Sequence, residues 1–177
     1  MKKAKLTAFC GMTTALSVVM MFITTFVPVA VYILPIVTGL AVYFVYLSAG
    51  KKWALGVFFA TAFLSLVLLT DKEAALTYTL FFGYYPLLKG NIEKLPKIPA
   101  FAVKLVLFNV AAVGIGFLGV YLFGVSGEEY NEFGKITVPL LLSLANITFL
   151  LYDFALLKNK MLSDRIALKI KRFINKR

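Results

Sequence analysis

The chain has 177 residues, of which 61% are hydrophobic and only 15% are charged, and its mean hydropathy is +0.89. A soluble domain of this length could not cover so much apolar surface, and a disordered chain would carry more charge. The 19 Lys and Arg residues outnumber the 8 acidic residues. In so apolar a chain, this excess indicates loops that face an anionic membrane surface rather than a nucleic acid.

The apolar residues fall into runs of the length that a membrane requires. A spanning helix needs about 20 mostly apolar residues, and six runs approach that length, the fourth being the shortest. They are residues 6–27, 29–49, 53–70, 74–88, 100–123 and 138–157. We therefore predict an all-α, polytopic membrane protein with six transmembrane helices in one domain, residues 1–157, and with both termini in the cytoplasm.

The first two runs are separated by Thr24, Thr25 and Pro28 but by no charged residue. A single helix through both runs would be about 60 Å long, twice the thickness of the hydrocarbon core. We therefore expect a hairpin with a tight turn near Pro28. Pro35 adds a second break, which favours a late start of the second helix after a loop over residues 28–35.

The distribution of basic residues agrees with six spans. With the N-terminus inside, nearly all Lys and Arg residues lie in the cytoplasmic segments, and the exceptions are Lys72, Lys104 and Lys135. This asymmetry follows the positive-inside rule. The basic tail, residues 158–177, places apolar side chains on one helical face from residue 160 onward, so we expect an amphipathic helix on the inner membrane surface.

Several classes of activity are excluded by composition. The chain has no His and a single Cys, Cys10, which rules out His-based acid–base catalysis, Ser-His-Asp triads, intrachain disulfides and zinc clusters. No P-loop, GxGxxG or HExxH motif is present. We expect no enzymatic activity, no catalytic residues, no cofactor and no bound metal.

Two charged residues lie inside predicted spans, Lys104 in the fifth and Asp153 in the sixth. An unpaired charge in a membrane is costly, and these two lie at matching depths in consecutive antiparallel helices. We predict a structural ion pair between them. Asn109 and Asn146 lie near the centre of the same two helices, where an interhelical hydrogen bond is the simplest expectation and a ligand contact is the alternative.

Polar and aromatic residues gather at the predicted outer ends of the helices. Together with Asn109 and Asn146, they are the candidates for binding a small polar solute, although each could equally be part of an ordinary loop rim. The candidates are Tyr32, Asp71, Lys72, Tyr78 and Tyr121, accompanied by Glu73, Glu128, Glu129, Tyr130 and Asn131.

The first span carries small residues at Ala4, Ala8, Gly11 and Ala15, which share one helical face. Small residues let helices approach closely in lipid. Packing within the six-helix domain and docking of a partner helix are both open explanations. For docking, the candidate residues are Ala8, Gly11 and Ala15.

The stretch Gly11-Met-Thr-Thr-Ala15-Leu-Ser-Val-Val19 resembles the Ala-x-x-x-Ala helix of the S components of energy-coupling factor transporters, with Gly11 in place of the first Ala. The size and the six predicted spans resemble the same family. The resemblance implies a bacterial membrane subunit for vitamin or micronutrient uptake. Its solute would bind beneath a lid over residues 27–35, its first helix would dock on the membrane T component, and cytoplasmic ATPases would act in trans.

Two alternatives come from different functional classes. A non-transport membrane scaffold, such as a subunit for cell-envelope assembly, would need no solute site. A membrane enzyme would need a carboxylate pair, a nucleophile with a base, or a metal cluster within the spans, and the sequence offers none of these.

Overall fold

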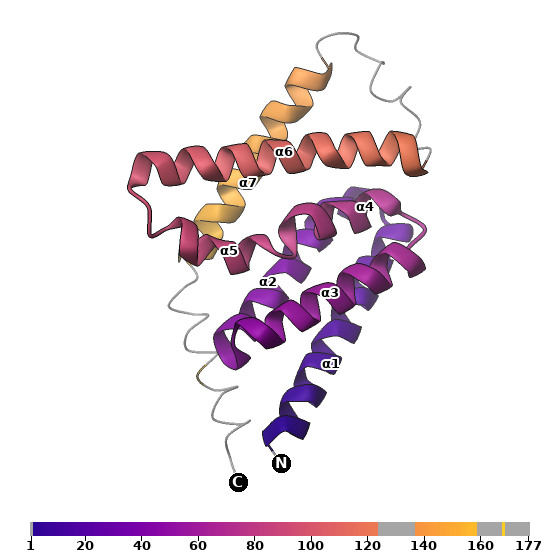
Figure 1. Cartoon of the computed structure of the whole chain (residues 1–177). Coiled ribbons are helices and arrows are strands. Elements are labelled where there is room, and N and C mark those ends of the chain that lie inside the picture. The colour runs from indigo at the N-terminus through magenta and orange to yellow at the C-terminus, as the bar shows by residue number, and fades with distance from the viewer. Residues whose placement is uncertain (1, 124–136, 159–167, 169–177) are drawn as a thin grey trace.

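The computed structural model describes residues 2–123, 137–158 and 168, and every regular element in these ranges is helical (Figure 1). The predicted all-α class is therefore confirmed. The helices are α1 (Lys2–Phe22), α2 (Ile33–Ala49), α3 (Lys51–Leu68), α4 (Lys72–Thr77), α5 (Tyr85–Ile92), α6 (Lys97–Phe123) and α7 (Thr137–Lys158). The predicted amphipathic helix of the tail lies outside the described residues, apart from Leu168.

The turn near Pro28 that the sequence predicts is present between α1 and α2. It consists of two short 3₁₀ turns, Ile23–Thr25 and Pro28–Val31. The second helix begins at Ile33, so Pro35 lies in its first turn, where a missing N–H costs no helical hydrogen bond. The expected late start of the second helix is therefore confirmed, but the connection ends at Tyr32 rather than at Pro35, because a proline in the first turn is compatible with a helix.

A single residue, Gly50, joins α2 to α3. Its φ of 92° is a conformation that favours glycine, and its N–H donates to the carbonyl of Tyr46 at 3.0 Å. Lys51 and Lys52, which the sequence placed in a loop, form the first turn of α3. The two helices pack directly against each other and against α1.

The fourth apolar run, predicted as one span over residues 74–88, is a broken helix. It consists of α4, a π-helical turn at Tyr78–Phe82, and α5. Pro86 has no N–H to donate to the carbonyl of Phe82, so the α-helical pattern cannot continue through this point. We call residues 72–92 the broken segment. At its middle, a Cβ on Gly83 would lie 2.6 Å from the ring of Phe58, so only glycine fits there.

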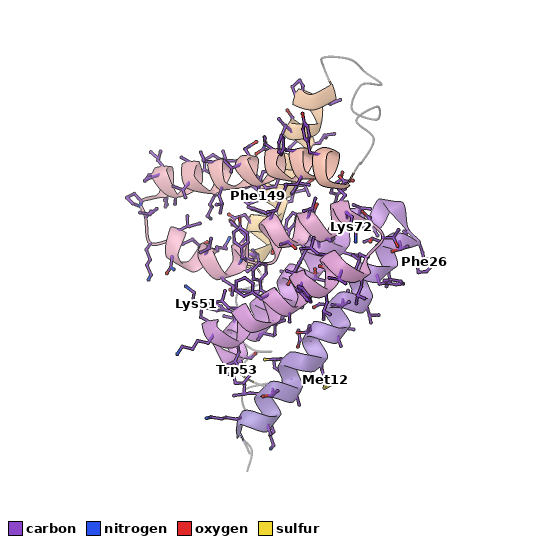
Figure 2. All side chains as sticks on the ribbon, turned by 45° about the vertical axis from the view of Figure 1, so that its right-hand side comes forward. Met12, Phe26, Lys51, Trp53, Lys72 and Phe149 are labelled. Atoms are coloured by element: carbon purple, nitrogen blue, oxygen red, sulfur yellow. The ribbon has the colours of Figure 1, made fainter. Side chains whose placement is uncertain are left out.

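Two apolar cores lie on either side of the broken segment. The first joins α1, α2 and α3 to one side of the π turn. The second is mainly aromatic and joins the segment to α6 and α7. In it the rings of Phe108 and Phe149 stack with centroids 4.8 Å apart, and Phe81 packs on Tyr85 at 4.9 Å. Figure 2 shows Phe149 in this position between the ribbons.

The surface of the described helices is apolar. Phe63, Val110 and Leu151 are each exposed by more than 60% of their area, which suits contact with lipid rather than with water. In the described residues, three helices are long and apolar enough to cross a membrane, within the ranges 3–25, 51–68 and 97–119. The chain is thus an all-α membrane protein. The count of six spans remains a prediction. The apolar stretches of α2 and α7 are shorter than those three, and the fourth run is broken.

Candidate functional site

The most concentrated polar chemistry in the described chain is a charge cluster around Asp153 of α7. Lys104 Nζ of α6 lies 2.9 Å from Asp153 Oδ2, so the ion pair that the sequence predicts is present. Lys89 Nζ of α5 bonds to Asp153 Oδ1 and also donates to its backbone carbonyl at 2.9 Å. The Tyr85 hydroxyl donates to the same Oδ1 at 2.5 Å. One carboxylate therefore ties α5, α6 and α7 together.

Glu93 completes this cluster at its more exposed side. Its Oε1 lies 3.3 Å from Lys89 Nζ and 3.6 Å from Lys104 Nζ. The two lysines are 5% and 8% exposed, so both ammonium groups are largely out of solvent. Two cations and two anions cancel, and buried charges require such compensation. Burial lowers the pKa of Lys89, and the Asp153 carboxylate opposes this by stabilising the charged ammonium.

Three members of the charge cluster, Tyr85, Lys89 and Glu93, were not found from the sequence. Tyr85 reads as an interfacial aromatic residue, and Lys89 and Glu93 read as parts of a cytoplasmic loop. The available signal was their spacing, because residues four apart lie on one helical face. A helix over residues 85–92 would have placed them beside one another, but Pro86 and Gly90 argue against a helix there.

Asn109 and Asn146 face each other between α6 and α7. Each amide donates to the side-chain oxygen of the other, at 3.0 and 3.1 Å. The second N–H of each donates to a carbonyl one turn earlier in its own helix, Leu105 or Leu142, at 2.8 Å. Both donors of each amide are thus used, which is the expected interhelical bond and leaves no amide N–H for a ligand.

The structure brings Tyr32, Asp71 and Lys72 to one end of the molecule, where α1 turns into α2 and α3 into α4. The Tyr32 hydroxyl donates to Glu73 Oε1 at 2.5 Å. Asp71 Oδ1 accepts the N–H groups of Glu73 and Ala74 and so caps α4. Figure 2 places Lys72 and Phe26 at this end, opposite Lys51 and Trp53.

Lys72 closes the end of α3. Its Nζ donates to the carbonyls of Leu66 at 2.8 Å and Leu69 at 2.7 Å, which are among the last carbonyls at this helix end. Asp71 and Lys72 thus both bind backbone groups at helix ends. The other four candidates, Glu128, Glu129, Tyr130 and Asn131, lie outside the described residues.

The remaining two candidates are elsewhere. Tyr78 is fully buried in the π turn and belongs to the first apolar core rather than to an outer rim. Tyr121 is 74% exposed near the end of α6, where its ring packs on Phe117 at a centroid distance of 4.4 Å.

The small-residue face of α1, defined here as Ala4, Ala8, Gly11 and Ala15, points away from the rest of the molecule. All four residues are exposed, and a Cβ on Gly11 would meet nothing within 4 Å. Met12, labelled in Figure 2, is 74% exposed on the same helix. Leu16 is also exposed. Packing within the described domain therefore does not explain the four residues.

Comparison of the chain with protein-family models, with curated proteins and with solved structures finds no match.

Proposed function

We propose that the chain is the solute-binding membrane subunit of an uptake transporter of the energy-coupling factor type, in a bacterial cytoplasmic membrane. The observation that carries this proposal is the outward orientation of the small-residue face of α1. In lipid, helices associate through close backbone approach rather than through the hydrophobic effect, so exposed small residues are suited to a partner helix. The partner would be a membrane T component, with cytoplasmic ATPases supplying the energy.

The opposite end of α1 supports the solute-binding part of the proposal. The two 3₁₀ turns after α1 lead to Tyr32, whose bond to Glu73 connects this segment to α4 beside Asp71 and Lys72. A small polar solute would bind beneath these turns by exchanging such internal contacts for contacts to itself. The vitamin or micronutrient class follows from the resemblance of α1 to the S-component helix.

The docking part is tested by co-purification of the full chain with a T component and its ATPases. The Gly11→Trp and Ala15→Trp variants should lose the complex, because an indole on this face prevents close helix approach. A matched control is Gly116→Trp on α6, where a Cβ also meets nothing within 4 Å. Complex formation by Gly11→Trp at the level of the unchanged chain would contradict the proposal.

A second candidate function, a membrane scaffold without a solute site, is favoured by a different observation. The polar candidates Asp71, Lys72, Asn109 and Asn146 all use hydrogen-bonding groups within the protein. A thermal-shift screen of the detergent-purified chain against vitamins separates the two functions. A ligand at 100 times its Kd adds about 2.7 kcal/mol to the stability of the folded state, whereas a scaffold would show no response.

A further inference from the structure

The two carboxylates of the charge cluster are held unequally. Glu93 Oε1 lies 3.3 Å from Lys89 Nζ and 3.6 Å from Lys104 Nζ, whereas Lys104 Nζ lies 2.9 Å from Asp153 Oδ2. A strong hydrogen bond between an ammonium group and a carboxylate is about 2.7–2.9 Å long. The Glu93 side chain is also 34% exposed, against 14% for Asp153. Glu93 is therefore the carboxylate that another anion can replace.

The surface next to Glu93 is open. Gly90 lies three residues before Glu93, so the two residues share one face at the end of α5. Gly90 is exposed, and a Cβ placed on it would meet nothing within 4 Å. A group from outside the protein can therefore approach the Glu93 side chain along this face.

The connection from α5 to α6 adds further positive charge beside the cluster. Lys94 and Lys97 are both exposed. Lys97 precedes Lys104 by two helical turns, so both residues lie on the same side of α6. Figure 1 shows this connection on the side of the molecule opposite the turn from α3 to α4. The positive-inside rule places a lysine-rich helix end of this kind in the cytoplasm.

Apolar side chains are exposed at the same helix end, and they are Leu95 (46%), Ile98 (84%) and Phe101 (51%). Lysines beside exposed apolar side chains suit the boundary between lipid headgroups and acyl chains. The cluster and its surroundings thus offer positive charge for a headgroup and an apolar surface for the chains attached to it.

We propose that Lys89 and Lys104 bind the phosphate of an anionic phospholipid of the inner leaflet, which takes the place of the Glu93 carboxylate. Without Glu93, two ammonium groups share one carboxylate, Asp153, and one positive charge is left over. The single negative charge of a phosphodiester restores the neutrality that buried charges require. Basic pockets between transmembrane helices on the cytoplasmic side bind lipid headgroups in this way. The site is independent of solute binding, so it applies equally to a transporter subunit and to a scaffold.

The test is thermal unfolding of the detergent-purified full chain in mixed micelles with a rising fraction of phosphatidylglycerol or of phosphatidylcholine. A lipid that binds only the folded state raises the unfolding midpoint, so phosphatidylglycerol should raise it and zwitterionic phosphatidylcholine should not. Glycerol 3-phosphate, which has no acyl chains, should have no effect. An equal rise with both lipids would overturn the proposal, and a rise with glycerol 3-phosphate would overturn the lipid assignment in favour of a free phosphate.

Variants of Glu93 test the exchange itself. Glu93→Gln removes the internal competitor, so half of the rise should be reached at a lower fraction of phosphatidylglycerol, by up to about fivefold, the factor that an exposed ion pair contributes. The matched control is Glu73→Gln, which removes the same charge near Tyr32 at the other end of the molecule and should leave the half-point unchanged. Equal shifts in both variants would indicate general attraction to the micelle and would overturn the site.

Variants of two exposed lysines locate the site. Lys97 and Lys51 are each the first residue of a helix, α6 and α3. Lys97→Gln should raise the fraction of phosphatidylglycerol needed for half of the rise, because Lys97 flanks the cluster, whereas Lys51→Gln should not. The same effect of both variants would contradict a site at the α5–α6 connection.

Discussion

Lys104 and Asp153 are 49 residues apart in the chain, yet the ammonium nitrogen of one lies 2.9 Å from a carboxylate oxygen of the other. This pair does not stand alone, because Lys89 bonds to the same carboxylate from the other side. The cluster is therefore asymmetric. Asp153 serves two cations, whereas each cation retains a second carboxylate neighbour in Glu93.

This asymmetry predicts unequal costs for removing each partner. Asp153→Asn should destabilise the folded state by about 3–5 kcal/mol, because it leaves two buried ammonium groups without their shared carboxylate. Lys104→Met should cost clearly less, since Lys89 still neutralises Asp153. The double variant should be more stable than Asp153→Asn alone. Unfolding by a denaturing detergent measures all three, and equal costs for the two single variants would contradict the arrangement.

Tyr85 should contribute through its hydroxyl. Tyr85→Phe removes the donor that bonds to Asp153 Oδ1 and is expected to cost about 1.5–3 kcal/mol, the range for a hydrogen bond to a charged group. The neighbouring Tyr84→Phe serves as control, because Tyr84 has no bond to the cluster in the described chain. The same unfolding measurement applies, and similar losses in both variants would speak against a specific bond.

The amide pair between α6 and α7 should behave as a unit. Asn109→Leu leaves the amide of Asn146 without its partner and should cost about 1–3 kcal/mol. Leucine at both positions should recover most of this loss, since no unpaired amide remains. A double-mutant cycle in detergent measures the coupling, and strictly additive losses would show that the two amides act independently.

Gly50 and Gly56 offer a matched comparison of backbone roles. Gly50→Ala forces an alanine into a φ of 92° and should destabilise by about 1 kcal/mol or more. Gly56 lies inside α3 with open space around its Cα, so Gly56→Ala should stabilise by up to about 1 kcal/mol. Thermal midpoints of the two variants should therefore move in opposite directions, and a shift in the same direction would be inconsistent with the α2–α3 connection.

Loss of the bond from Tyr32 to Glu73 should increase local opening of the turn after α1 more than it lowers global stability. Tyr32→Phe removes the donor at an exposed site, so the loss in global stability should stay below about 1 kcal/mol. Hydrogen exchange of the backbone over residues 23–32 should nevertheless become faster, because the turn after α1 loses this tie to α4. Unchanged exchange rates in this segment would show that the bond does not hold the connection.

Much of the fold follows from run length and hydropathy. The predicted runs coincide with α1, α2, α3, α6 and α7 to within a few residues. The fourth run differs because hydropathy does not report a π turn, which here is closed by the bond from the Gly83 N–H to the Tyr78 carbonyl. A lone proline in an apolar run is also found in intact spans, so the pattern did not reveal the break.

The sequence predicted the site residues for which an unpaired polar group in a membrane would be costly. It missed the residues for which water is an alternative partner. Lys104, Asp153, Asn109 and Asn146 lie in apolar runs, and polar groups at such positions require the contacts that are observed. Tyr85, Lys89 and Glu93 lie in a polar stretch, where water would satisfy them equally well. Only the position of α5 against α7 decides that Lys89 is buried.

The charge cluster also has a consequence for biosynthesis. Lys89 and Lys104 emerge from the ribosome before Asp153, the carboxylate they share, which arrives on the final helix of the described domain. Until α7 is inserted, Glu93 is the only carboxylate of the cluster that the chain has supplied, so one of the two positive charges has no partner there. The cluster therefore becomes neutral only when the last helix of the described domain is complete.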